Sequence, residues 1–432
     1  MDISAGLPLG PGGRRPVHPL DPHFMTLRLL VIAPGQQAGG ANLLLARTAI
    51  HMARRHGFHL NLVDFEDGAT RAAWLAEGIP FEFSRYEVGG DIDIGTADVV
   101  MISLLGAKLF PKRLKGNLDA KLLAWCTAPQ DPFKFLPPSY FFNGWSWRAK
   151  RAVARWLFRA HSSRIAKFLF DGADRGGVVF MDVHCHEANE KLFGAGIPRA
   201  FVPICTGSPD QGPRVATPKT GKAYWVGRIT DFKTEPFIAM TRELLGHGSA
   251  IKEVVVVGDG ADLKTARKRL SGLPITWLGY VEPKRLDAEL RDNADMVFGH
   301  ATALLEAAKL GIPSLLIDGT YDRIEENQLR SEWLHRCAPG YVGKITSATG
   351  LIGRTVADCL RELRADPVVI AAADYQHWSK HHRPEVIAGK LAEVIHQGSY
   401  TCADFLKSGA AEPGCIGQML EWAKESVFRR KY

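Results

Sequence analysis

The chain has 432 residues, 46% of them hydrophobic and 23% charged, a composition typical of a soluble globular protein with about two domains. No apolar run reaches the ~20 residues that cross a bilayer, and seven scattered cysteines without a C-x-x-C pair argue against a disulfide framework or a zinc ribbon. The net charge of +8 indicates an acidic partner, such as a sugar nucleotide, an anionic lipid or nucleic acid.

The N-terminal half is predicted to alternate strands with helices. Residues 1–24 lack the apolar segment of a secretory signal, so we expect a disordered extension over residues 1–25. Residues 27–34 form a continuous apolar run, as expected of a strand that is covered on both faces. A Gly-rich loop over 35–42 and a helix over 43–56 follow. Further strands are predicted at 59–65, 80–86, 97–104, 121–126 and 178–183, which indicates βαβ units and a parallel sheet.

A second series of strands and helices follows a polar, Gly- and Pro-rich linker. Its strands are predicted at 223–226, 253–257, 276–278, 295–298 and 314–317, and its helices at 234–245, 262–270, 283–291, 302–310 and 327–335. The predicted fold class is α/β, with two doubly wound, Rossmann-like domains that face a central cleft. The expected parts are an N-terminal domain over 26–205, a hinge over 206–221, a C-terminal domain over 222–395, and helices over 396–432 that pack back toward the N-terminal domain.

The segment from 297 to 318 carries the strongest functional signal. It reads as a strand, a glycine turn, a short helix, a Gly-x-Pro stop and a buried strand. A glycine turn that feeds a helix directs free backbone amides and the positive end of the helix dipole at one point, which favours a bound phosphate. We predict that Thr302 caps this helix, that Thr302 and Ala303 contact the phosphate, and that Glu306 accepts hydrogen bonds from ribose hydroxyls. The alternative for Glu306 is a first-turn carboxylate that favours the helix dipole.

Four motifs of the C-terminal half follow one another along the chain. They are WVGRI at 225–229 with Lys233, VVGDG at 256–260, WLGYV at 277–281, and LEAA at 305–308 followed by Gly-Ile-Pro at 311–313. In order and spacing they resemble the donor domain of GT-B glycosyltransferases, and the large family 4 group (glycosyl transferases group 1) in particular. The match covers residues 222–318, whereas the N-terminal, acceptor-side half matches in outline only.

The resemblance implies a role for each motif. Arg228 and Lys233 would hold the donor diphosphate, where two cations offset the charge that grows as the glycosidic bond breaks. The alternative is that both are solvated loop charges. The GDG at 258–260 lacks the third glycine of a dinucleotide fingerprint, so a tight turn at a strand end is the favoured interpretation. Further donor contacts would come from tight turns and backbone groups at Gly39, Gly40, Gly258, Gly279 and Tyr280.

One position departs from the family pattern. Phe298 stands where family 4 enzymes usually carry a glutamate that touches the donor sugar, so the sugar and the choice between retention and inversion stay open. Asp131 and His184 are the candidates for a catalytic base at the edge of the cleft. A retaining reaction, which we expect, needs no protein base because the leaving phosphate can take the acceptor proton. No Asp-x-Asp motif follows a suitable strand, which predicts metal-independent chemistry without a cofactor beyond the nucleotide sugar.

Two histidine-containing segments have other interpretations. In an extended run, Asp182, His184 and His186 would share one face and could form a metal cluster. Structural or acceptor-side polar residues are the favoured interpretation, and no metal site is expected. The histidine pair at 381–382 has no nearby carboxylate in the sequence and is expected at the surface.

A helix predicted over 145–170 indicates where the protein acts. Its arginines recur at helical spacing and form one basic stripe beside an apolar face. Basic amphipathic helices of this kind often rest on anionic membranes, which would give peripheral contact with the inner face of the membrane. The favoured interpretation of the helix by itself is a surface helix that packs its apolar face on its own domain. The stripe consists of Arg148, Arg151, Arg155 and Arg159.

Together these observations predict a cytoplasmic glycosyltransferase of the hexosyltransferase type. It would move a sugar from a nucleotide diphosphate sugar to a glycan or lipid-linked acceptor, in bacterial surface polysaccharide or lipopolysaccharide synthesis. The alternatives are an inverting GT-B transferase and a non-catalytic GT-B protein that binds glycan or acts as a scaffold. A sugar-nucleotide epimerase would need an acid/base set that the sequence does not supply. Binding of nucleic acid, which would rest on positive charge alone, is not expected.

Overall fold

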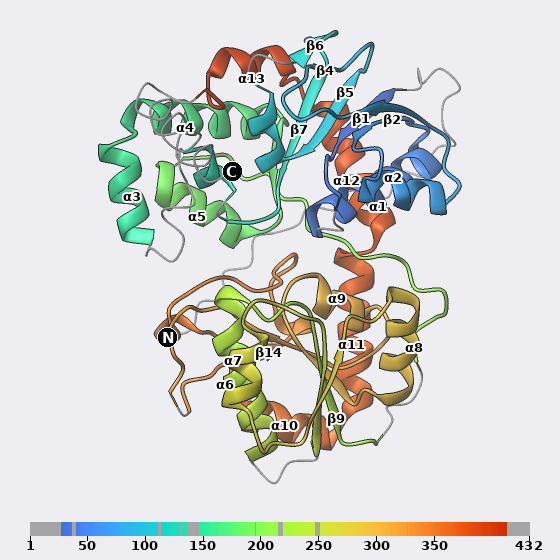
Figure 1. Ribbon diagram of the computed structural model, residues 1–432, viewed down its shortest axis with the longest axis vertical. Coiled ribbons are helices and arrows are strands. Elements are labelled where there is room, and N and C mark those ends of the chain that lie inside the picture. Colours follow the sequence, from blue (N-terminus) through green and yellow to red (C-terminus); the bar gives the residue numbers. More distant parts are fainter. Residues whose placement is uncertain are drawn as a thin grey trace, which may run out of the picture.

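The computed structural model of the protein describes residues 27–36, 40–110, 114–129, 131–136, 147–194, 196–214, 219–246, 251–325 and 327–412. Within these ranges, the side chains of residues 147, 148, 151, 154, 155, 283 and 284 are also outside the description. The expectations for residues 1–25, for Gly39 and for the chain beyond 412 therefore lie outside the described residues. Figure 1 shows two α/β halves, one above the other, each built on its own sheet.

The first half is built on a six-stranded parallel sheet with the strand order β3-β2-β1-β5-β7-β8. The inner strands consist almost wholly of buried apolar residues, as in a sheet that is covered on both faces. The strands are β1 (Arg28–Ile32), β2 (His59–Asp64), β3 (Phe81–Arg85), β5 (Val99–Ser103), β7 (Lys121–Cys126) and β8 (Val178–Phe180), with a separate pair β4 (Ile92–Asp93) and β6 (Leu114–Lys115). The helices are α1 (Gly40–His56), α2 (Ala69–Ala76), α3 (Trp147–Trp156), α4 (Arg159–Asp174) and α5 (Val183–Phe193).

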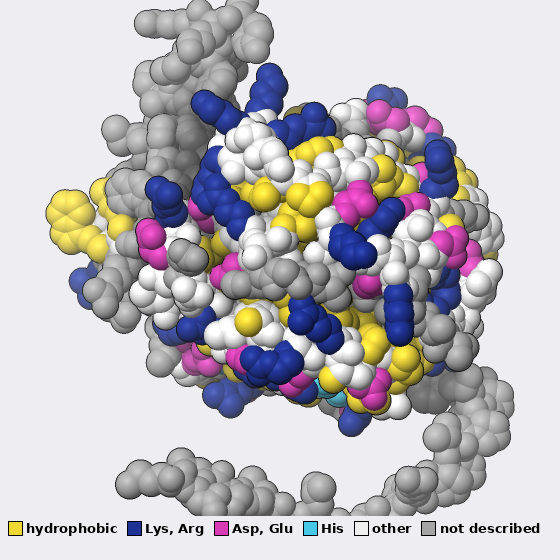
Figure 2. All heavy atoms as spheres, turned by 90° about the horizontal axis from the view of Figure 1, so that it is seen from below, with side chains coloured by type: hydrophobic (Ala, Val, Ile, Leu, Met, Phe, Trp, Pro, Cys, Tyr) yellow, Lys and Arg dark blue, Asp and Glu magenta, His cyan; other side chains and the backbone are white. Residues whose placement is uncertain are grey.

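The second half has a second six-stranded sheet with the order β11-β10-β9-β12-β13-β14, parallel except for β14 at its edge. Its strands are β9 (Lys222–Val226), β10 (Glu253–Val257), β11 (Ile275–Gly279), β12 (Met296–Gly299), β13 (Ser314–Ile317) and β14 (Ser331–Trp333). Its helices are α6 (Thr234–Gly246), α7 (Leu263–Arg269), α8 (Pro283–Asn293), α9 (Thr302–Ala308), α10 (Val356–Ala365) and α11 (Pro367–His381). On the face of this half seen from below, the described Lys and Arg side chains are interspersed with Asp and Glu and form no single basic patch (Figure 2).

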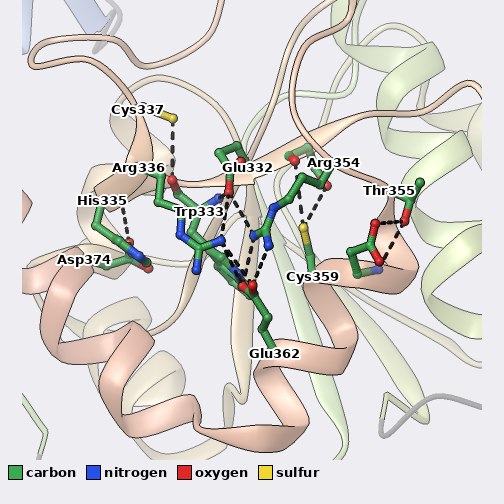
Figure 3. Close-up of polar contacts among 12 residues, drawn as sticks. Glu332, Trp333, His335, Arg336, Cys337, Arg354, Thr355, Cys359, Glu362 and Asp374 are labelled. Atoms are coloured by element: carbon green, nitrogen blue, oxygen red, sulfur yellow. Dashed lines mark hydrogen bonds and ion pairs between the residues drawn. The ribbon is translucent and has the colours of Figure 1, made fainter. Parts of the chain in front are cut away.

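The helix predicted at 327–335 is wrong, because β14 (Ser331–Trp333) runs antiparallel to β13 there. The two outer residues of β14 are buried and Glu332 between them is not, which is the alternation of a strand with one face on the core. Arg354 bridges Glu332 of this edge strand to Glu362 of α10 (Figure 3), with 3.0 Å between its Nη2 and the Glu332 Oε1. The strand is therefore defined by partners that are distant in sequence.

The C-terminal helices connect the two halves. α11 packs beside α9 of the second half, whereas α12 (Pro384–Gln397) packs along α1 and α13 (Cys402–Ser408) along α4 (Figure 1). The chain thus returns to the first half at α12, earlier than the boundary after residue 395 that the sequence suggested. The reason is the apolar face of α12, whose buried residues join the core of the first half. No helix of the described residues combines the length and the hydropathy needed to cross a membrane.

The two halves are in contact through a shared apolar core. Residues of α9, of β13 and of the chain after β14 in the second half belong to the same buried cluster as the first sheet. Hydrogen bonds also connect the expected hinge to the second half. Thr206 accepts a hydrogen bond from the Trp378 indole at 2.8 Å, and Arg214 donates to the Ala294 carbonyl at 2.6 Å. His382, expected at the surface, is buried and its Nδ1 lies 2.7 Å from the Ile204 carbonyl oxygen. The residues of the second half in the cluster are Leu304, Leu305, Ala308, Leu316, Leu334, Tyr341 and Val342.

Candidate functional site

Two glycine turns lie against each other at the carboxyl ends of β9 and β10. A Cβ at Gly258 would be 2.2 Å from the Gly227 carbonyl oxygen, and one at Gly260 would be 2.1 Å from the Ile229 carbonyl oxygen. Gly258 also has a φ of +134°, a conformation that favours glycine. The Ile229 amide donates to the Asp259 carbonyl at 2.8 Å. The tight turn at Gly258 is therefore a support for the neighbouring loop after β9.

That neighbouring loop carries two cations. Arg228 is exposed, and Lys233 follows in a short 3-10 turn, with its Nζ 5.9 Å from the centroid of the Phe232 ring. Burial and the nearby Arg228 guanidinium lower the pKa of Lys233 to about 8. Within the described part of the chain, neither side chain forms an ion pair with a carboxylate. Two adjacent cations without a counter-ion form a site that favours an anion.

His300 lies beside these cations and was not predicted from the sequence as a site residue. Only 7% of the residue is exposed, and neither ring nitrogen has a hydrogen-bond partner among the described residues. Burial and the charge of Lys233 hold the pKa of His300 well below its usual value. The signal in the sequence was a histidine directly after the glycine turn of β12, where the chain approaches the expected phosphate.

The start of α9 differs from the prediction in one detail. Thr302 is the first helical residue rather than the cap, and the N-cap position is Ala301, which makes no side-chain cap. Ala301 has a φ of +56° and its amide donates to the Val342 carbonyl at 2.7 Å, so the backbone turns one residue earlier than expected. The amides of Thr302 and Ala303 have no acceptor among the described residues. They remain available to a ligand.

Glu306 lies at the junction of the two halves and is ion-paired on both oxygens. Its Oε1 is 3.2 Å from Nη1 of Arg47 on α1, and its Oε2 is 2.5 Å from the Nζ of Lys309. Lys309 in turn lies 3.0 Å from the Asp287 carboxylate. A ligand hydroxyl that reached Glu306 would therefore share it with Arg47.

The remaining predicted donor contacts are Gly39, Gly40, Gly279 and Tyr280. Gly40 is the first residue of α1, while Gly39 is outside the described residues. Gly279 has a φ of +69°, and its carbonyl oxygen accepts from the Gly258 amide at 2.7 Å. Tyr280 beside it is 82% exposed, so its ring is accessible for stacking on a base.

The two candidates for a base lie in different settings. Asp131 is buried, and its Oδ1 is 3.5 Å from the Lys134 Nζ, while burial raises the pKa of its carboxyl. His184 is in the first turn of α5, with its ring 4.5 Å from that of Tyr341 in the other half. Burial and then Lys344 lower the pKa of His184, which keeps the ring neutral near pH 7. Of the two, His184 faces the second half.

The segment after β8 is helical rather than extended. Asp182 is the N-cap of α5 and accepts from the Cys185 amide at 2.6 Å, so the common face expected for residues 182, 184 and 186 does not form. The chain enters a helix here because an aspartate cap satisfies a free amide of the first turn. No cluster of metal ligands occurs among the described residues.

Near Asp182 lies a second carboxylate, Asp318, which was not predicted from the sequence as a site residue. Asp318 follows β13 and accepts hydrogen bonds from the Tyr341 hydroxyl and, at 3.0 Å, from the Lys344 amide. Burial, and to a smaller extent Asp318, raises the pKa of Asp182 to about 6. The second oxygen of each carboxylate has no partner within the described ranges. An aspartate directly after a buried parallel strand was the available signal.

The helix predicted over 145–170 is two helices. α3 ends at Trp156 and α4 begins at Arg159, with the buried Phe158 as the N-cap. Trp156 is 86% exposed and Arg159 is also exposed. The side chains of the other three predicted arginines, at 148, 151 and 155, lie outside the description.

Comparisons with known proteins agree with this architecture. No protein-family model matches the sequence, and no curated protein sequence matches it. The structure of HepE from Anabaena in complex with UDP and glucose matches with a TM-score of 0.50 at 13% identity, over 86% of this chain and 99% of that chain. A glycosyltransferase from Rickettsia africae ESF-5 (TM-score 0.48, 11% identity, 87% and 99% covered) and WaaG, a glycosyltransferase involved in lipopolysaccharide biosynthesis (TM-score 0.47, 15% identity, 86% and 100% covered), are less similar.

These findings confirm the predicted fold class. Two Rossmann-like α/β halves meet at the carboxyl ends of their parallel strands, where the cations after β9 and the turn before α9 also lie. The likeness to HepE extends over almost the whole of that chain. The chain has the GT-B fold of glycosyltransferases.

Proposed function

We propose that the protein is a glycosyltransferase of the hexosyltransferase type, which moves a sugar from a nucleotide diphosphate sugar to a glycan or lipid-linked acceptor. The observation that carries this proposal is the pair of cations after β9. Arg228 and Lys233 lie close together in the loop that follows β9, without a carboxylate partner among the described residues. A bound diphosphate would neutralise both cations, and the same cations would stabilise the charge of the departing diphosphate.

The other donor contacts are assigned by position. The amides of Thr302 and Ala303, which have no acceptor among the described residues, would bind a phosphate oxygen, and the exposed Tyr280 ring would stack on the base. Glu306 would bind the ribose hydroxyls, with Arg47 shifting away from the Glu306 Oε1. The HepE structure holds UDP and glucose, which supports a nucleoside diphosphate hexose as the first donor to test.

The proposed reaction is retaining and independent of metal. Arg228 and Lys233 would supply the positive charge at the leaving group, and the leaving phosphate would take the proton of the acceptor hydroxyl. For an inverting reaction, His184 is the candidate base because its ring is neutral near pH 7 and faces the second half. Asp131 is less suited to this role, because it is buried beside Lys134.

The proposed place of action is the cytoplasmic face of a membrane, in the synthesis of a bacterial surface polysaccharide or lipopolysaccharide. Trp156 is almost fully exposed at the end of α3, and the chain around it carries the predicted arginines. An exposed tryptophan beside basic residues fits the boundary between water and an anionic lipid surface. Such a contact would bring the first half close to a lipid-linked acceptor.

Thermal unfolding with UDP-, GDP- and ADP-glucose tests the donor site, because a ligand bound only by the folded chain raises the Tm. One of the three is expected to raise it, and Arg228→Ala is expected to weaken binding roughly tenfold to a hundredfold, as for the loss of one charged hydrogen bond. Lys268→Ala, which removes an exposed cation from α7, is the matched control. Absence of binding by all three sugars, or unchanged binding by Arg228→Ala, would contradict the proposal.

A non-catalytic GT-B protein is the second candidate, and Phe298 favours it. This residue stands where family 4 enzymes place a sugar-binding glutamate, and it is fully buried against Trp225, with 5.7 Å between the ring centroids. It therefore offers no contact to a donor sugar. Release of nucleoside diphosphate from a bound sugar nucleotide, measured with candidate acceptors, separates the two functions, since binding without any release would favour the non-catalytic one.

A further inference from the structure

We infer that His300 is a third cationic contact of the donor: it takes up a proton when the diphosphate binds and then donates to a phosphate oxygen. This inference rests on the proposed donor site and adds to it a residue outside the motifs that the chain shares with family 4 enzymes. His300 would thereby act together with Arg228 and Lys233, the two cations predicted to hold the diphosphate.

The geometry leaves the ring few other functions. His300 is more than nine-tenths buried, and both of its ring nitrogens lack a partner in the described part of the chain. The ring lies between Trp225 and Phe232, with centroid distances of 5.8 and 5.7 Å, so apolar walls hold it in place. Leaving a buried polar group unpaired is unfavourable, because the group loses its hydrogen bonds to water. A phosphate oxygen would remove that cost.

The backbone around His300 is fixed as well. Ala301 is held at a φ of +56° by the hydrogen bond of its amide to Val342. A Cβ at Gly343 would be only 3.0 Å from the His300 Cβ, so the loop of Gly343 packs directly against the histidine. The imidazole therefore cannot leave the site by a small movement of its loop.

The charges around the ring explain why a ligand would change its protonation. Lys233 lies next to it in the turn after β9, and burial together with the Lys233 charge disfavours a charged imidazole. Arg228 in turn lies close to Lys233. The Asp318 carboxylate lies beyond Gly343 and is already bound to Tyr341 and to the Lys344 amide. A diphosphate would reverse the sign of the local field, because it brings two negative charges next to three potential donors.

Proton uptake on binding is measurable by calorimetry. Donor binding is titrated at pH 7.0 in PIPES and in imidazole, buffers with different enthalpies of ionisation, using UDP-, GDP- and ADP-glucose. These diphosphate diesters do not titrate near neutral pH, and Lys233, with a pKa of about 8, is already mostly protonated. The wild-type protein is expected to take up close to one proton per bound sugar nucleotide.

Two variants assign the proton. His300→Asn is expected to abolish the uptake and to weaken binding by about tenfold, whereas His59→Asn, at an exposed position of β2, should match the wild type. Binding without proton uptake by the wild-type protein would overturn the inference and leave the donor site standing. Uptake that persists in His300→Asn would also overturn it. Failure of all three sugars to bind would overturn the donor site together with the inference.

Discussion

Asp182→Asn should stabilise the protein near neutral pH. The Asp182 carboxylate is buried, and burial raises its pKa from 3.8 to about 6. The folded chain therefore binds this proton more tightly than the unfolded chain does. Below pH 3.8 the wild-type protein is as stable as a protein with a neutral side chain at this position. As the pH rises from 3.8 through about 6, the wild-type protein loses stability relative to that protein. An asparagine oxygen can still accept from the Cys185 amide, so the helix cap is kept.

The magnitude follows from the two pKa values. The interval from 3.8 to about 6, at about 1.4 kcal/mol per pH unit, gives a penalty of roughly 3 kcal/mol for the ionised wild-type side chain at pH 7.5. At pH 4.5 the unfolded chain is mostly ionised and the folded chain mostly protonated, so the penalty is only about 1 kcal/mol. The gain from Asp182→Asn should therefore be about 2 kcal/mol larger at pH 7.5 than at pH 4.5.

Urea unfolding at both pH values, followed by tryptophan fluorescence and circular dichroism, measures this difference. The chain has two halves, so the transition of the first half must be resolved before a free energy is assigned. Asp210→Asn removes an exposed carboxylate and is the matched control, with the same stability change expected at both pH values. Equal gains for Asp182→Asn at the two pH values, or no gain at pH 7.5, would refute the reasoning.

Two further predictions concern the glycine turn and the membrane contact. Gly258→Ala would place a Cβ 2.2 Å from the Gly227 carbonyl oxygen, so it should lower the Tm by about 5 °C or more and weaken donor binding. Gly246→Ala is the control: its Cβ would have no atom within 4 Å, so the Tm and the donor affinity should not change. A Gly258→Ala protein with the wild-type Tm and affinity would show that the turn does not support the Arg228 loop. In sedimentation with vesicles, the protein should bind vesicles that contain phosphatidylglycerol more strongly than neutral vesicles. Trp156→Ser should reduce this binding, whereas the control Leu75→Ser, at an exposed position on α2, should not. Equal binding to both vesicle types would contradict the membrane contact.

The fold was predictable from the sequence because its signals are local. The inner strands are continuous apolar runs, and the glycine turns after β9 and β10 are visible as short motifs. The edge strand β14 was not predictable in this way, since its three residues become a strand only by pairing with β13. The break between α3 and α4 at Phe158 depends likewise on that ring being buried in the core.

The candidate site was predictable in part for the same reason. Arg228, Lys233 and the turn before α9 belong to motifs with a defined spacing, and the structure brings Lys233 together with Arg228. His300 and Asp318 carry no such motif, and their significance depends on partners from other strands and loops. The ion pair between Glu306 and Arg47 joins residues 259 positions apart, a separation that no local pattern encodes.

Within the ranges that the structure describes, the chain crosses between its halves twice, once after Thr206 and once between α11 and α12, and hydrogen bonds from Trp378 and His382 join the two crossings. Two adjacent connections allow one half to rotate relative to the other about the line that joins them. They restrict rotation about other axes and separation of the halves. The first half is also discontinuous in sequence, because α12 and α13 complete it from the far end of the chain. No single cut in the polypeptide therefore yields an intact first half, and on the ribosome that half is complete only after the second half has been synthesised.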